Sequence, residues 1–260
     1  MSRSHPHNNV STLTRSGSPS GCQECALSPV CLPPALEEGD LDQLESIINR
    51  PRPLARGQVL FHQGDPFTAI YAVRAGAIKT SVTQSDGTEH ITGFYLAGEV
   101  VGLDAVNKDQ HSSTAIALDN TALCVIPFDS LEDLAAHQPG LQHHLFRLFS
   151  QEIQSDQQML MLLGKRQAEA RIAAFLIGLA TRFSRRQLSG TEFTLPMSRT
   201  DIANHLGLTI ETVSRLFSRL EQAGLIHTAG RELQILDREA LFRLADPAAE
   251  RADEAATRLR

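Results

Sequence analysis

Short alternations of apolar and polar residues dominate the first half of the chain, and longer helical spacings dominate the second. From about residue 54 to residue 127 the alternation is interrupted at intervals by glycine, which is typical of many short strands in a sandwich or jelly-roll barrel. Before it, residues 37–49 place leucine and isoleucine on one helical face, and Pro51 and Pro53 end that helix. The pattern predicts a β-barrel domain preceded by a short helix.

Two short amphipathic stretches near the C-terminus form a second pattern. Ser198 and Asp201 resemble a capping box at the start of the first helix, Gly207 makes a turn, and Thr209 can cap the second helix. This arrangement predicts a helix-turn-helix, the motif that places its second helix in the major groove of DNA. The stretch 225–236, with a glycine at its centre, predicts a β-hairpin wing that follows the motif.

The outward face of the predicted second helix carries candidates for DNA contact. Arginine can bind guanine as a fork, glutamate can accept from cytosine, and serine can adapt to either partner. The candidates for base edges are Glu211, Thr212, Ser214 and Arg215, and those for phosphates are Arg199, Arg219 and Arg231. The net charge is −6, but residues 165–235 carry 10 Lys/Arg against 6 Asp/Glu, whereas residues 1–164 carry 9 against 18. The basic excess therefore lies on the predicted DNA-binding segment.

Helical spacing without proline over residues 140–164 predicts a long helix, assigned to 138–164, and another helix follows at 166–186. A heptad assignment places Phe146, Ile153 and Leu160 at position a, and Phe149, Asp156 and Leu163 at position d. A further core helix would show a similar stripe. The place of this helix between the barrel and the helix-turn-helix favours a seam between two copies of the chain.

Asp156 brings a carboxylate into a core position of that seam. In a parallel two-fold dimer its counterpart would face it, and like charges in partly desolvated surroundings are costly unless one is protonated. The dimer would then be marginal, so a modest external input could decide its assembly. A heptad register displaced by one residue would instead leave Asp156 in solvent.

The chain has four cysteines, and three lie close together near the N-terminus. Cys22, Cys25 and Cys31 are spaced C-x2-C-x5-C, whereas Cys124 lies on the last predicted strand. Four thiolates would complete the ligand shell of an iron–sulfur cluster or of zinc. The N-terminal stretch has no apolar run that could serve as a signal peptide, and no segment is apolar enough to span a membrane. We therefore expect a cytoplasmic protein, in which clustered thiols are more typical of metal sites than of disulfides.

The spacing of the cysteines bears on which metal they would hold. Structural zinc sites usually pair two C-x2-C knuckles, and this chain has one. Ala26, Leu27, Pro29 and Val30 give the loop an apolar lining that would limit access of solvent and oxidant. The pattern favours an iron–sulfur cluster, with zinc as the alternative.

Three segments together resemble the CRP/FNR family of bacterial regulators, and within it the oxygen-sensing FNR (fumarate and nitrate reduction) branch. They are CQECALSPVC, ITGFYLAGEVVG and LGLTIETVSRLFSRL, and the similarity runs from about Cys22 to Leu244. The resemblance implies an α+β fold: a cyclic-nucleotide-binding-like β-barrel (jelly roll), a long dimerisation helix and a C-terminal winged helix-turn-helix. We expect a disordered tail at 1–20, the cluster loop and sensory barrel at 21–137, the dimerisation helix at 138–164, the DNA-binding domain at 165–245, and a flexible tail at 246–260.

The resemblance also implies a function, that of a transcriptional activator or repressor active without oxygen. Cys22, Cys25, Cys31 and Cys124 would hold an oxygen-labile [4Fe–4S] cluster. The intact cluster would favour a homodimer that binds a palindromic double-stranded DNA site resembling TTGAT-N4-ATCAA, and oxygen would convert the cluster and separate the dimer. Glu211, Ser214 and Arg215 match the family's base-reading residues, and Asp156 matches its charged position on the dimer helix. Family members contact RNA polymerase through barrel loops, for which the turn at 85–88 is the expected counterpart.

Four other readings are less well supported. In the cyclic-nucleotide branch the ligand phosphate needs an Arg-Ser pair after a G-E-x-x-G turn, and here the turn at Gly98–Gly102 is followed by HSSTAIA, without arginine. A haem sensor would need a buried histidine, whereas most of the histidines lie in the N-terminal tail or on polar faces. No G-x-S-x-G, P-loop, H-E-x-x-H or dinucleotide motif indicates an enzyme. A domain that only binds other proteins would not explain the predicted recognition helix.

Overall fold

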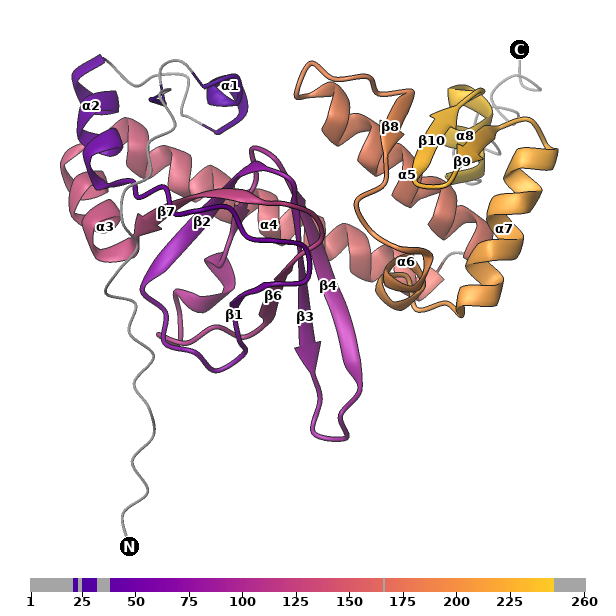
Figure 1. Cartoon of the computed structure of the whole chain (residues 1–260), viewed down its shortest axis with the longest axis horizontal. Helices are drawn as coiled ribbons and strands as arrows, with labels where there is room; N and C mark the ends of the chain where they lie inside the picture. The colour runs from indigo at the N-terminus through magenta and orange to yellow at the C-terminus, as the bar shows by residue number, and fades with distance from the viewer. Residues whose placement is uncertain (1–20, 23–24, 32–37, 166, 246–260) are drawn as a thin grey trace, which may run out of the picture.

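The computed structural model describes residues 21–22, 25–31, 38–165 and 167–245, and the two predicted tails lie outside these ranges. A β-rich N-terminal domain and a mainly helical C-terminal domain are joined by one long helix, α4 (Figure 1). The elements of the first domain are α1 (Ser28–Cys31), α2 (Glu38–Ile47), β1 (Val59–Phe61), β2 (Ala69–Ala75), β3 (Ala77–Thr83), β4 (Glu89–Leu96), β5 (Val100–Val101), β6 (Thr114–Ala117), β7 (Ala122–Pro127) and α3 (Phe128–His137), with a 3-10 turn at Leu103–Ala105. After α4 (Pro139–Lys165) follow α5 (Ala168–Ser184), β8 (Glu192–Thr194), α6 (Arg199–His205), α7 (Ile210–Gln222), β9 (Ile226–Ala229), β10 (Glu232–Ile235) and α8 (Arg238–Ala245).

The strands of the first domain form two antiparallel sheets that face each other across an apolar core. One sheet has the order β1-β6-β3-β4 and the other the order β5-β2-β7. Val73 of β2 and Ile78 of β3 are fully buried in this core. Ile70 lies on the other face of β2 and is buried with residues of α2 and α3, so both faces of this strand are covered and its burial does not follow the predicted alternation. At the tight turn between β2 and β3, Gly76 has φ +81°, and a Cβ there would lie 2.5 Å from the carbonyl oxygen of Asn120. Only glycine fits this turn.

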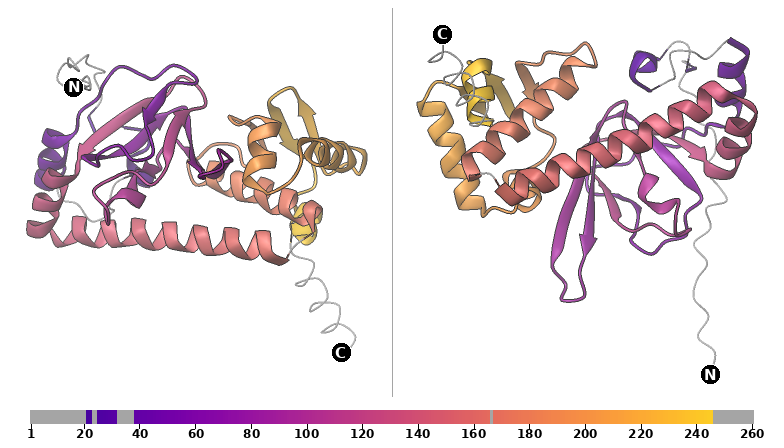
Figure 2. Two further views of the ribbon diagram at one scale, coloured as in Figure 1. Left: turned by 90° about the horizontal axis from the view of Figure 1, so that it is seen from below. Right: turned by 180° about the vertical axis from the view of Figure 1, so that it is seen from behind.

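Helix α4 runs along the barrel and continues beyond it to the C-terminal domain (Figure 2). Its first turns pack inward, with Leu141 buried and Leu145 and Leu148 against the barrel core. The opposite side carries three large apolar side chains at seven-residue spacing: Phe146 is 62% exposed, Ile153 57% and Leu160 70%. Helix α4 is therefore apolar on both sides, and a single chain buries only one of them.

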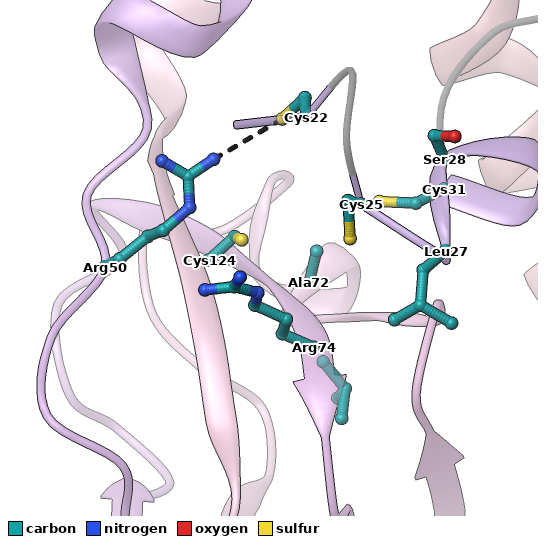
Figure 3. A pocket seen from close by; sticks show the side chains of 10 residues that line it. Cys22, Cys25, Leu27, Ser28, Cys31, Arg50, Ala72, Arg74 and Cys124 are labelled. Atoms are coloured by element: carbon teal, nitrogen blue, oxygen red, sulfur yellow. Dashed lines mark hydrogen bonds between the residues drawn. The ribbon is translucent and has the colours of Figure 1, made fainter. Parts of the chain in front are cut away.

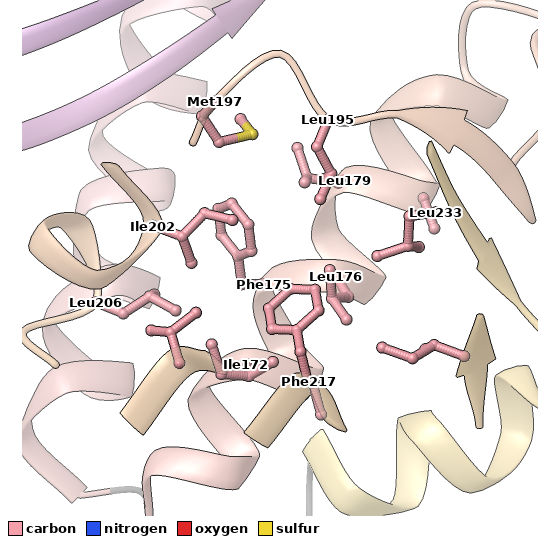
Figure 4. Close-up of a cluster of buried hydrophobic side chains, with 14 of the residues drawn as sticks. Ile172, Phe175, Leu176, Leu179, Leu195, Met197, Ile202, Leu206, Phe217 and Leu233 are labelled. Carbon is pink, nitrogen blue, oxygen red and sulfur yellow. The ribbon is translucent and has the colours of Figure 1, made fainter. Parts of the chain in front are cut away.

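The C-terminal domain is built around a core of α5, α6, α7 and a small sheet (Figure 4). The Ser198 hydroxyl accepts the backbone N–H of Asp201 at 3.1 Å, and the Asp201 carboxylate accepts the backbone N–H of Ser198 at 2.9 Å, so the predicted capping box is present. Thr209 caps α7 by accepting the N–H of Thr212. The wing has a third strand that the sequence did not predict, because β8 pairs with β10 in the order β8-β10-β9.

The two domains share an apolar boundary. Ile91, Phe94 and Leu96 of β4 belong to the same buried cluster as the inner faces of α5 and α6. Polar contacts border it: Lys79 pairs with Asp201 at 2.9 Å, and Glu99 accepts hydrogen bonds from Arg182 and Arg186. The start of the helix-turn-helix is therefore fixed against the barrel strands β3 and β4.

Candidate functional site

The four cysteines line one pocket at the end of the barrel (Figure 3). Cys22 and Cys25 lie in the N-terminal loop, Cys31 ends the single turn α1, and Cys124 projects from β7 beside Ala72 of β2. The loop is folded by its own backbone, since the N–H of Cys31 donates to the carbonyl of Leu27 at 2.8 Å. A helical turn within a proline-containing loop was not predicted, and it positions Cys31. The pocket brings together the residues that the sequence singled out.

Burial controls the chemistry of these thiols. It raises the pKa of Cys22 and the pKa of Cys31 to about 12 each, and it also raises the pKa of Cys124. The neighbouring thiols act in the same direction, because Cys124 and Cys25 raise the pKa of Cys31 further. The thiols of Cys22, Cys31 and Cys124 thus resist ionisation, and a positively charged centre among them would favour the thiolates. The donor set fits a metal or cluster that draws all four thiolates together.

Zinc and an iron–sulfur cluster place different demands on four thiols. Tetrahedral zinc needs its four sulfurs at about 2.3 Å from one centre. Within the described ranges no group of three or more His, Cys, Asp or Glu side chains converges tightly enough to hold one ion. An iron–sulfur cluster is larger and takes each thiolate on a different iron. The apolar lining includes Leu27, Ala72 and Val73.

The predicted base-reading residues lie on the exposed side of α7. Glu211, Ser214 and Arg215 are exposed at the N-terminal end of the helix, and Thr212 is half-buried beside its cap Thr209. Arg215 reaches back along the helix, and its Nε donates to the carbonyl of Glu211 at 3.4 Å. The opposite face, with Val213 among others, is buried in the domain core. This is the orientation that a recognition helix requires.

All three arginines predicted to meet phosphates have partners within the chain. The guanidinium of Arg199 lies over the ring of Phe217, 3.3 Å from its centroid, and burial lowers the pKa of Arg199 to about 10. Arg231 donates to the carbonyls of Leu195 and Pro196. Arg199 therefore packs against the buried side of the recognition helix α7. This contact is visible only in the tertiary structure. Arg219 has a largely exposed side chain, and its Nη2 lies 3.4 Å from the carboxylate of Glu169.

Two parts of the chain match known domain families. Residues 51–138 match the cyclic nucleotide-binding domain, and residues 170–244 match the Crp-like helix-turn-helix domain. The transcriptional activator protein FnrA of Stutzerimonas stutzeri is 48% identical over 224 residues, which cover 86% of this chain and 92% of FnrA. The chain belongs to the FNR branch of the CRP/FNR family.

Further comparisons agree with this assignment. The fumarate and nitrate reduction regulatory protein of Escherichia coli (strain K12) is 46% identical, with 86% of this chain and 90% of that protein covered. The solved structure of FixK2 from Bradyrhizobium japonicum has a TM-score of 0.69 and 30% identity, and covers 76% of this chain and 97% of FixK2. The predicted fold, with its barrel, long helix and C-terminal helix-turn-helix, is confirmed. The CRP/FNR family consists of transcription regulators and not of enzymes, as the sequence indicated.

Proposed function

We propose that this chain is an oxygen-responsive transcription regulator whose Cys22, Cys25, Cys31 and Cys124 hold a [4Fe–4S] cluster. The observation that carries the proposal is the meeting of an N-terminal loop and strand β7 in one thiol-lined pocket. When bound, the cluster supplies an inorganic core that oxygen can attack. The reduced thiols it requires agree with a cytoplasmic location. Among the described residues no helix combines the length and apolar content needed to cross a membrane.

The packing around the pocket suggests how the cluster acts on the dimer. Cys22, Cys31 and Cys124 pack against the same apolar core as Leu145 and Leu148 of α4. The backbone of Cys31 also acts on the ring of His144, on α4, where it opposes the lowering of the His144 pKa by burial. A change in the cysteine loop would therefore reach the helix directly, and its outer face would pair with the same face of a second copy.

The dimer would bring two recognition helices to a two-fold symmetric site on double-stranded DNA. A palindrome resembling TTGAT-N4-ATCAA is the site that we propose, with Glu211, Ser214 and Arg215 reading its bases. The exposed turn at 85–88 lies at the tip of the β3–β4 hairpin, which projects from the barrel (Figure 1). We propose this tip as a contact for RNA polymerase.

Three features of the barrel disfavour a cyclic nucleotide as ligand. The carboxylate of Glu99, in the G-E-x-x-G turn, already accepts from Arg182 and Arg186. The hydroxyls of Ser112 and Ser113 donate to the carboxylate of Asp104. A phosphate at this position would meet a negative charge and no arginine from the HSSTAIA segment.

Anaerobic purification followed by exposure to air tests the proposal. We expect absorbance at about 400 nm, iron and sulfide in equal amounts, and a shifted band with palindromic DNA, all lost in air. Colourless protein with one tightly bound zinc would refute the cluster. A coloured cluster that leaves DNA binding unchanged in air would refute the oxygen response.

Arg215 gives a separate test of the DNA interface. Replacing it with alanine should weaken binding to the palindrome by about 1–3 kcal/mol and relax the preference at one base pair, because a guanine fork is lost. Arg219→Ala is the matched control on the same helix. It should weaken all sequences alike and reduce the salt dependence by about one charge, as a phosphate contact does. Fluorescence anisotropy with single-base variants of the site measures both effects, and equal selectivity in the two variants would contradict the assignment.

A further inference from the structure

An ion pair lies directly behind the thiol pocket. The carboxylate of Glu45, on α2, accepts both terminal nitrogens of Arg50, at 2.5 and 2.8 Å. The same carboxylate accepts the backbone N–H of Cys22 at 2.8 Å. The pair is half-buried, with 20% of the Arg50 side chain and 31% of the Glu45 side chain exposed. Glu45 thus orients the arginine and the backbone of one proposed ligand at once.

Arg50 also reaches the sulfurs themselves (Figure 3). Its Nη2 lies 3.6 Å from the Sγ of Cys22, in hydrogen-bonding contact. Arg50 lines the same pocket as Cys124, and its positive charge opposes the rise in the pKa of that thiol. One guanidinium therefore contacts a thiol of the N-terminal loop and lies in the same pocket as the thiol from the barrel.

The backbone next to Arg50 explains why it is held there. Asn49 forms a two-way backbone bridge with Val125, and both of its hydrogen bonds are 2.8 Å long. Val125 follows Cys124 on β7, so the residue before Arg50 is fastened to the residue after the barrel cysteine. Arg50 is thereby placed by the strand, independently of the N-terminal loop.

This geometry suits a cluster with thiolate ligands. Four thiolates bring more negative charge than the iron–sulfur core offsets, and hydrogen bonds to the sulfurs are among the factors that tune such clusters. A guanidinium offers a permanent cation with donors in a fixed fork, which a lysine cannot reproduce. Groups that orient metal ligands in this way commonly change metal affinity about 10- to 100-fold when replaced.

We propose that Arg50, oriented by Glu45, is a positioning residue that holds the ligand Cys22 to the barrel strand that carries Cys124 and offsets the charge of the cluster ligands. This inference depends on the proposed function, because it assumes that the pocket holds a cluster. It goes further, because it proposes that two residues that are not ligands, Arg50 and Glu45, hold the site together.

Retention of the cluster under an iron chelator, without oxygen, tests the role of Arg50. We expect Arg50→Gln to lose its absorbance at about 400 nm roughly tenfold faster than the wild type. Arg52→Gln is the matched control, since it removes the same charge from an exposed side chain two residues away. It should stay within about twofold of the wild type. Arg50→Lys should be intermediate, because it keeps the charge and loses the fork.

Unfolding of the cluster-free proteins separates positioning from folding. If Arg50→Gln and Arg52→Gln unfold at the same temperature while only the former loses its cluster quickly, the role of Arg50 is confirmed. Should Arg50→Gln be unstable, Glu45→Gln keeps the arginine and is expected to speed cluster loss in the same direction. If the wild type holds a cluster and Arg50→Gln retains it as long as Arg52→Gln does, this inference is overturned. The proposed function is then left intact. A wild type without any cluster would overturn both.

Discussion

Replacing Cys124 with alanine is expected to abolish cluster binding, the largest effect that one substitution outside the DNA interface should have. Cys124 is the one proposed ligand on the barrel, fixed by the pairing of β7 with β2 beside Ala72. The other three thiols lie on the N-terminal segment, so without Cys124 a cluster would lose its connection to the rigid domain. Iron content, sulfide content and absorbance at about 400 nm, measured anaerobically, should all fall to background. Binding to the palindrome should fall with them.

Ser28→Ala is the control for this substitution. Ser28 lines the same pocket and is not a proposed ligand. We expect this variant to keep its cluster, which shows that a change in the wall of the pocket is not enough to lose it. Thermal unfolding of cluster-free Cys124→Ala should match that of the cluster-free wild type, because the thiol is half-buried and forms no disulfide among the described residues. Full iron content in Cys124→Ala would show that the barrel cysteine is not a ligand.

Local sequence signals predicted most of the architecture, and their limits are physical. The capping box at Ser198, the cap at Thr209 and the glycine turns depend on neighbouring residues, so they could be found without tertiary information. Helices α3 and α8 are 10 and 8 residues long, and strand β8 has 3 residues. Elements this short obtain their stability from packing against the rest of the chain, and their own patterns are weak.

The same distinction applies to the candidate sites. The cysteine spacing identified all four thiols of the pocket, because ligand chemistry limits the choice of residue types. No local pattern indicated that Arg50 would reach the pocket, since its partners Glu45 and Cys22 are set by folding. Arg199 is the opposite case. The sequence suggested that its guanidinium contacts a phosphate, and in the structure that guanidinium lies over the ring of Phe217. Charged side chains acquire their roles from long-range contacts that no local pattern encodes.

Asp156→Ala is expected to strengthen dimerisation of the cluster-free protein by about 2 kcal/mol, roughly 30-fold in the dissociation constant of the dimer. Asp156 is exposed in the single chain and stands between Ile153 and Leu160 along the same side of α4. Partial burial already raises the pKa of Asp156, and a facing copy would raise the pKa further. Above that pKa two carboxylates would oppose assembly, and alanine removes both. Sedimentation velocity of the cluster-free proteins measures the change.

Two comparisons decide whether charge is the cause. Asp156→Asn keeps the size of the side chain and removes the charge, so it should recover much of the gain shown by alanine. Glu239→Ala removes a carboxylate that is 91% exposed and lies on α8, outside the proposed seam, and should leave the dimer unchanged. If the wild type and Asp156→Ala dimerise equally, the seam has another register and Asp156 remains in solvent. If Asp156→Ala alone dimerises in air and binds the palindrome, then charge repulsion at this one position keeps the protein monomeric once its cluster is lost.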